Sequence, residues 1–225
     1  MNLYFLVEGK RTEKKVYPAW LGHLTPFLSE VKRFGEVDSN NYFIFSGEGY
    51  PSLLDIHLPN AIKDFKATEK YDVLVVALDV DESTPENRTN EVVCKAIESG
   101  LPKEQLRIIP QNCCIESWFL GNPRVISAGT QSQRLAEFLN HYNVRSDDPE
   151  LMPVMSGFNT KSQFHYEYFK EVAKNKNFNY SKYKPGHVVD ATYIKELKQR
   201  VAKSDQMDTL GGFFSLCEEI ENRSV

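Results

Sequence analysis

The most restrictive feature of this 225-residue sequence is an unbroken apolar run, VLVVAL, at residues 73–78. A strand made of these residues has no polar face to turn toward water, so both of its faces must be buried. Burial of that kind is typical of a parallel sheet with helices packed on both sides. The run therefore predicts an α/β fold with a mostly parallel sheet flanked by helices.

Other segments fit the same architecture. Apolar and β-branched composition predicts three further strands, at residues 3–7, 42–45 and 105–109. Helical periodicity predicts helices between the strands, at residues 18–33, 51–65 and 86–99. The start of the first helix stays open, because either Thr12 or Pro18 could begin it.

The second half of the chain has a different pattern. Helical periodicity dominates, in stretches at residues 117–120, 132–142, 161–174, 191–202 and 210–222. We therefore predict an α/β core over residues 1–125 and a helical portion over residues 126–225 that packs on the core.

Composition limits the function classes. With 27 basic and 31 acidic side chains the formal net charge is −4, so the protein is not expected to coat nucleic acid through its overall charge. No apolar run approaches the roughly 20 residues that a membrane span needs, and no segment has the features of a signal peptide. We expect no membrane partner.

The four cysteines do not form a CxxC pair, so a zinc site of the usual spacing is not expected. The adjacent pair Cys113 and Cys114 lies in apolar sequence and is interpreted as two small buried residues. The five histidines also lack close metal-binding spacing. Together these features predict a reducing, cytoplasmic setting.

Acidic residues follow two of the predicted strands. Glu8 ends the first strand, while Asp79 and Asp81 follow the apolar run. In an open parallel sheet, ligands bind beyond the carboxyl ends of the strands. Clustered carboxylates at that edge favour a cation such as Mg²⁺, which prefers oxygen ligands. Taken singly, each acidic segment is also compatible with a helix cap or a polar surface loop.

The residues after Glu8 fit a phosphate site. Gly9 allows a sharp turn and close approach of a ligand. Lys10 and Arg11 could hold a phosphate beside the acids. The alternative is that this basic stretch is a solvated helix face.

Three motifs in this order resemble the TOPRIM fold. They are E-G-x-x-T-E at residues 8–13, D-x-D at residues 79–81, and NCCIESWFLGN at residues 112–122. The last is similar to a segment of the small stand-alone TOPRIM proteins, the RloB-like group, which resemble in turn the nuclease domain of OLD-family proteins. The resemblance covers residues 3–122 and, more faintly, the later helices.

The resemblance implies a metal-dependent nuclease that hydrolyses phosphodiester bonds of nucleic acid with Mg²⁺ or Mn²⁺. Carried over by motif, the metal-binding and catalytic acids are Glu8, Asp79, Asp81 and Glu116. Glu82 extends the D-x-D into an acidic run, so which acids ligate stays open. The resemblance further implies a role in anti-phage defence beside an ATPase partner. The acidic balance of the chain suggests that substrate grip comes from a homodimer or from a partner.

A lysine is expected to offset phosphate charge in the transition state. Lys10, Lys182 and Lys184 are the candidates, and spacing does not choose among them. Lys182, Lys184 and His187 belong to FNYSKYKPGH, where aromatic and basic residues alternate as in segments that bind single-stranded nucleic acid. A packed loop with solvated lysines is the alternative.

Three function classes stay open at this stage. The first is the nuclease, with DNA or RNA (tRNA included) as substrate. The second is an inactive TOPRIM scaffold or regulatory subunit. The third is a phosphotransfer or primase-like enzyme, which needs a nucleotide-binding element that the sequence does not contain, since no Walker A motif is present.

Overall fold

A computed structural model describes residues 1–126 and 131–223. Its centre is a parallel sheet of five strands in the order β2-β3-β1-β4-β5. The strands are β1 (Leu3–Val7), β2 (Ser29–Val31), β3 (Asn41–Ser46), β4 (Val73–Asp79) and β5 (Leu106–Gln111). The predicted α/β class with a parallel, helix-flanked sheet is confirmed.

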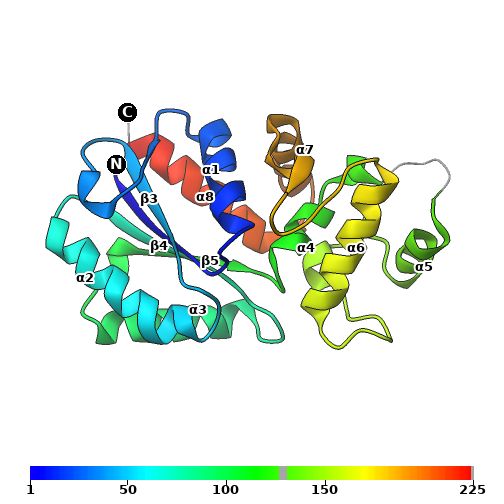
Figure 1. Ribbon diagram of the computed structural model, residues 1–225, viewed down its shortest axis with the longest axis horizontal. Helices are drawn as coiled ribbons and strands as arrows, with labels where there is room; N and C mark the ends of the chain where they lie inside the picture. Colours follow the sequence, from blue (N-terminus) through cyan, green and yellow to red (C-terminus); the bar gives the residue numbers. More distant parts are fainter. Residues whose placement is uncertain (127–130, 224–225) are drawn as a thin grey trace.

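Helices cover both faces of the sheet (Figure 1). The main helices are α1 (Glu13–Leu24), α2 (Leu58–Thr68), α3 (Pro85–Glu98), α4 (Ile115–Leu120), α5 (Gln133–His141), α6 (Lys161–Asn175), α7 (Ala191–Lys203) and α8 (Asp208–Arg223). Short turns of 3-10 or π type connect several of them. One of these turns, Leu53–His57, precedes α2 and occupies part of the helix predicted from residue 51.

Side chains alternate between two cores along the central strands. Phe5 and Val75 pack with α1 and α8 on one face. Leu6 and Val76 pack with α2 and α3 on the other face. The side chains of residues 73–78 are at most 1 % exposed, which is why this segment contains no polar residue.

The strand order creates a crevice beside β1. The chain leaves β1 for α1, which lies on the face that α8 shares, whereas it leaves β4 for α3 on the opposite face. β1 and β4 are hydrogen-bonded neighbours. Two connections that depart to opposite faces from adjacent strands open a gap at their carboxyl ends, where ligands bind in open α/β sheets.

The predicted helix over residues 18–33 is wrong at its C-terminal end, and of the two starts left open the structure has the earlier one, with Thr12 as the N-cap. Helix α1 begins at Glu13 and contains Pro18, and it ends at Leu24. Pro26 follows and disfavours helical backbone at Thr25, whose hydroxyl donates to the carbonyl oxygen of Leu21 at 2.9 Å. The chain then forms the short edge strand β2, which the sequence did not predict.

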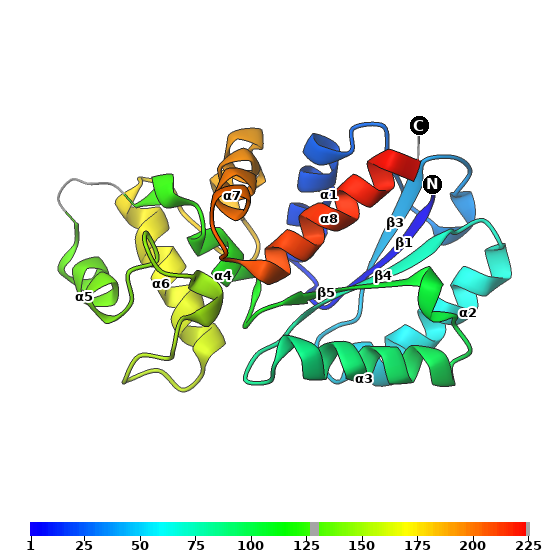
Figure 2. The same ribbon diagram turned by 180° about the vertical axis from the view of Figure 1, so that it is seen from behind.

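Helices α4 to α7 lie beyond the carboxyl edge of the sheet, and α8 returns to cover one face of the sheet (Figure 2). Arg107 on β5 and Glu219 on α8 form an ion pair of 2.6 Å. The helical portion and the sheet thus share one core, and the proposed boundary near residue 125 stays a prediction. Within the described residues, we find no helix with the length and apolarity needed to cross a membrane.

Candidate functional site

A cleft of about 300 Å³ lies at the carboxyl edge of β1 and β4. The loop after β1 and the end of β4 supply most of its acidic and basic lining residues: Glu8, Lys10, Arg11, Glu13, Glu48, Asp79 and Lys182. The sequence predicts ligand binding at this edge, and two of the predicted acids, Glu8 and Asp79, meet in the cleft.

Glu8 is held in place by the end of β4 and by the loop that follows β3. Its carboxylate accepts hydrogen bonds from the backbone N–H of Asp79 at 3.0 Å and of Tyr50 at 3.2 Å. Its own backbone N–H donates to the carbonyl oxygen of Ala77 and so extends the ladder with β4. Burial raises the pKa of Glu8, and the charge of Asp81 adds to the rise, while the two backbone N–H groups oppose it.

Asp79 is the last residue of β4, and one of its carboxylate oxygens has no partner. Atom Oδ1 is buried and lacks any hydrogen bond. Burial raises the pKa of Asp79 well above its ordinary value, and the charges of Glu13 and Glu8 raise it further. A buried carboxylate oxygen without a donor is costly, so this atom points to a missing cation or proton.

Glu13 is a third acid of the cleft, 5 % exposed, in the first turn of α1. Its carboxylate accepts a hydrogen bond from the backbone N–H of Gly9 at 3.0 Å. A Cβ added at Gly9 would collide with that carboxylate, so a residue without a side chain is needed there. Burial raises the pKa of Glu13 to about 7, with further contributions from Glu116 and Glu8.

Glu116 lies close behind these acids, on α4, but does not line the cleft. It is 2 % exposed and accepts a hydrogen bond from the hydroxyl of Tyr180 at 2.7 Å. Its charge contributes to the raised pKa values of Glu13 and Asp79. The structure therefore brings Glu116 near the acids, with one oxygen already occupied.

The second acid of the D-x-D is turned away from the cleft. β4 ends at Asp79, and Asp81 has a left-handed φ of +52°, so the backbone is not extended across the whole D-x-D. Its carboxylate accepts a hydrogen bond from the hydroxyl of Ser162 at 2.7 Å. Glu82 also faces α6, where it accepts from the backbone N–H of Lys161 at 2.8 Å.

Lys182 supplies positive charge to the cleft. It lies in a turn closed by Ser181 and Lys184, and the hydroxyl of Thr12 donates to its carbonyl oxygen at 3.3 Å. Burial lowers the pKa of Lys182, but the charges of Glu116 and Asp79 outweigh it and raise the pKa overall. The lysine is therefore held in its charged form.

Lys10 and Arg11 lie on the rim, as expected of phosphate-binding residues. Lys10 pairs with Glu48 at 3.1 Å. The guanidinium of Arg11 stacks 3.8 Å from the ring centroid of Tyr183, which is 55 % exposed. An exposed cation stacked on an exposed aromatic ring is suited to contact a phosphate and a base together.

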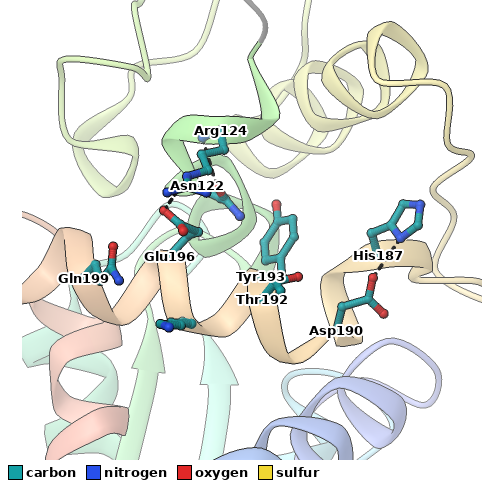
Figure 3. Close-up of a pocket in the computed structure, with 9 residues that line it drawn as sticks. Asn122, Arg124, His187, Asp190, Thr192, Tyr193, Glu196 and Gln199 are labelled. Atoms are coloured by element: carbon teal, nitrogen blue, oxygen red, sulfur yellow. Dashed lines mark hydrogen bonds and ion pairs between the residues drawn. The ribbon is translucent and has the colours of Figure 1, made fainter.

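Two predicted substrate-binding residues lie elsewhere. Lys184 is exposed and does not line the cleft. His187 lies in a separate hollow of about 500 Å³, where its ring pairs with Asp190 at 2.8 Å (Figure 3). In the same hollow, Arg124 pairs with Glu196 at 3.0 Å.

The acids fit a magnesium site built on two carboxylates better than one built on four. Among the described residues, no three carboxylates have oxygen atoms that all lie within 4.8 Å of one another. Mg²⁺ is commonly held by one or two carboxylates, with water and substrate phosphate completing its ligands. The adjacent pair Glu8 and Asp79, with the unpartnered Oδ1, meets that requirement.

Sequence reasoning missed two residues of this region. Glu13 was visible as the last acid of E-G-x-x-T-E but was not selected as a site residue. Arg88, on α3, packs its guanidinium 3.8 Å from the ring centroid of Tyr50, and its charge lowers the pKa of Glu8. Nothing in the local sequence marks Arg88, because its place beside Glu8 depends on how α3 returns across the sheet.

The scan against protein-family models finds no matching family, and comparisons with curated proteins and with solved structures find no match either. The resemblance to TOPRIM proteins therefore remains a prediction from the three motifs.

Proposed function

We propose that this protein is a divalent-metal-dependent nuclease whose site is the cleft at the carboxyl edge of β1 and β4. One observation carries the proposal: a buried, unpartnered carboxylate oxygen of Asp79 lies amid Glu8, Glu13 and Glu116. The charges of Glu116 and Asp79 also raise the pKa of Lys182, which lines the same cleft. Such an excess of negative charge is stabilised by a divalent cation.

Glu8 and Asp79 are the residues that would hold Mg²⁺ or Mn²⁺. When bound, the cation would polarise a phosphodiester and lower the pKa of a water ligand. The negative charge of Asp81 raises the pKa of Glu8, and that of Glu116 raises the pKa of Asp79. Both charges would strengthen the attraction of the pair for a cation. The two acids that carry these charges each have a hydroxyl partner, on Ser162 and Tyr180 respectively.

The other cleft residues have distinct roles in phosphodiester hydrolysis. Glu13, whose pKa is about 7, can accept a proton from water and release it again near neutral pH. Lys182 offsets negative charge on the phosphate as it develops. Lys10 and Arg11 bind the flanking phosphates, and Tyr183 offers a face on which a base can stack.

The partners and setting follow from the same proposal. The substrate is DNA or RNA, with tRNA as one candidate. Because the net charge is −4, the basic rim of the cleft would make the main contacts with the nucleic-acid phosphates. A homodimer or an ATPase partner would add further contacts and raise the affinity. A cytoplasmic role in anti-phage defence completes the proposal.

The test is a cleavage assay with the purified full chain. Supercoiled plasmid, single-stranded DNA and a tRNA mixture are incubated with Mg²⁺ or Mn²⁺, and separately with EDTA. We expect cleavage of at least one substrate with metal and none with EDTA. Asp79→Asn keeps the shape of the side chain and should slow cleavage about 1,000-fold. Asp205→Asn changes an exposed acid between α7 and α8 and should leave the rate unchanged.

Calorimetry with Mn²⁺ separates the nuclease from the inactive scaffold. We expect the wild type to bind Mn²⁺ and Asp79→Asn to lose that binding. If Asp79→Asn cleaves as fast as the wild type, the assignment of the site is wrong. If the wild type binds no Mn²⁺ at millimolar concentration, the nuclease proposal fails and the scaffold is favoured.

A further inference from the structure

A second group of metal-binding residue types lies behind the acidic cleft. Cys113 and Cys114 are in the loop between β5 and α4, and His165 is on α6. Their two sulfur atoms and one imidazole nitrogen all lie within 4.8 Å of one another. All three side chains are buried, at 3 %, 2 % and 0 % exposed. We call these residues the Cys/His cluster.

The imidazole of His165 is already oriented as a ligand. Its Nε2 lies 3.1 Å from the carbonyl oxygen of Met152, which can only accept a hydrogen bond, so Nε2 carries the proton. The other ring nitrogen, Nδ1, is buried and has no hydrogen-bond partner. Metal-binding histidines typically donate the second N–H to a carbonyl or carboxylate in this way, which leaves the lone pair for the metal.

The backbone brings both sulfurs to one side. Adjacent residues of an extended chain point in opposite directions. Cys113 instead has a φ of +62°, a left-handed conformation that is uncommon for a residue other than glycine. The carbonyl oxygen of Cys113 accepts from the backbone N–H of Asp81 at 2.8 Å, which holds this turn in place.

The donor set selects the kind of metal. Thiolate and imidazole ligands are typical of Zn²⁺, with Zn–S near 2.3 Å and Zn–N near 2.0 Å. Donors at those distances around a tetrahedral ion lie about 3.5–4 Å apart, a separation that the Cys/His cluster can reach with small side-chain shifts. We propose that Cys113, Cys114 and His165 form a binding site for Zn²⁺, independent of the proposed nuclease activity.

Such an ion would join two parts of the molecule. The two cysteines belong to the loop that follows the edge strand β5, whereas His165 belongs to α6 in the helical portion. The hydroxyl of Ser162, one turn before His165, lies 3.6 Å from the sulfur of Cys113 and donates to Asp81. The ion would therefore fix α6 against the loop that carries Asp81 and against α4, which carries Glu116.

Zinc content and cobalt spectroscopy test the site. The full chain, purified under reducing conditions without chelator, should contain about one Zn²⁺ per chain by mass spectrometry of the elements. After zinc removal, Co²⁺ should produce a thiolate-to-cobalt charge-transfer band in the near ultraviolet. Cys113→Ser and His165→Gln should each weaken Co²⁺ binding at least about 100-fold. Cys217→Ser removes a buried thiol of α8 outside the Cys/His cluster and should keep the band.

The wild-type spectrum decides the outcome even if a variant fails to fold. A wild-type chain that contains no zinc and gives no charge-transfer band with Co²⁺ overturns the proposal. Equal Co²⁺ affinity of folded Cys113→Ser and wild type also overturns it, since binding then occurs elsewhere. Asp79→Asn should retain the band, and its loss in a folded variant would show that the ion sits at the acids instead.

Discussion

The acidic cleft and the Cys/His cluster lie at the same end of the sheet, and they differ in both chemistry and access. Glu8, Glu13 and Asp79 present oxygen atoms to an open cleft of about 300 Å³. Cys113 and its two partners present sulfur and nitrogen atoms and are closed off from solvent. The cleft is open to a cation or a substrate from solution, whereas the Cys/His cluster is not.

The difference shows how setting, together with residue type, separates the two proposed roles. Burial raises the pKa values of Asp79 and Glu13, and the charges of the neighbouring carboxylates raise them further. In the Cys/His cluster, hydrogen bonding by Cys114 lowers the pKa of the Cys113 thiol to about 5, with a further contribution from His165. Crowding of carboxylate charge is a property of the cleft, and changes there should alter pH dependence and catalysis.

The largest effect expected beyond those already described concerns pH. Glu13 has a pKa of about 7 in the folded chain against an ordinary 4.5, so the folded state binds its proton more tightly than the unfolded state. Its contribution is favourable at low pH and is lost as the pH rises from about 4.5 to about 7. At about 1.4 kcal/mol for each pKa unit, the loss is about 3 kcal/mol.

Urea unfolding of the metal-free chain at about pH 5 and about pH 8 measures this loss. Glu13→Gln keeps an acceptor for the N–H of Gly9 and removes the titrating group, so the difference between the two pH values should shrink by about 3 kcal/mol. Glu104→Gln, at an exposed acid, is the control and should leave the difference as in the wild type. An unchanged difference in Glu13→Gln would mean that crowding of charge does not distinguish the cleft.

The next effect concerns Lys182, the lysine that supplies positive charge to the cleft. Lys182→Met removes the charge that faces Glu116 and Asp79 and should lower kcat about 30-fold, or about 2 kcal/mol. Lys184→Met is the matched control two residues away, outside the cleft, and should change kcat little. Similar losses in both variants would indicate a general charge effect. The cobalt spectrum of the Cys/His cluster should be the same in both.

The smallest effect concerns packing beneath the acids. Gly9→Ala places a methyl group against the carboxylate of Glu13, which must shift and lose its backbone hydrogen bond. Thermal or urea unfolding should show a destabilisation of about 1 kcal/mol. Gly22→Ala in α1 has open space around it and should stabilise the fold by up to about 1 kcal/mol, because alanine favours helix. A neutral Gly9→Ala would show that the cleft has room to relax.

Sequence patterns predicted the central strands well because buried strands have a recognisable apolar composition. β1 matches its predicted range, β3 is longer than predicted by one residue at each end, and β4 is longer by one residue at its C-terminal end. β2 lacks such a composition, since it has three residues at the sheet edge and two of them are exposed. Its pairing with β3 depends on backbone groups that composition does not reveal.

The candidate site likewise contains residues whose positions the sequence could predict and residues whose positions it could not. Glu8 and Asp79 could be placed together from their positions at strand ends, because parallel strands share an edge. The orientation of Asp81 could not, since it depends on a left-handed backbone and on the hydroxyl of Ser162 from α6. The Cys/His cluster escaped detection for a related reason: His165 approaches the cysteines from a distant helix, and no local spacing records that approach.

The return of α8 to the sheet has a consequence for synthesis. Leu210, Phe213 and Ile220 of α8 complete the core on the face shared with α1, and Glu219 pairs with Arg107 across 112 residues of chain. On the ribosome, α1 and strands β1 to β5 emerge well before α8, so the part of this face that α1 does not cover stays exposed while α4 to α7 are translated. Chaperone binding to the nascent chain should accordingly peak in this interval and fall once α8 has cleared the exit tunnel.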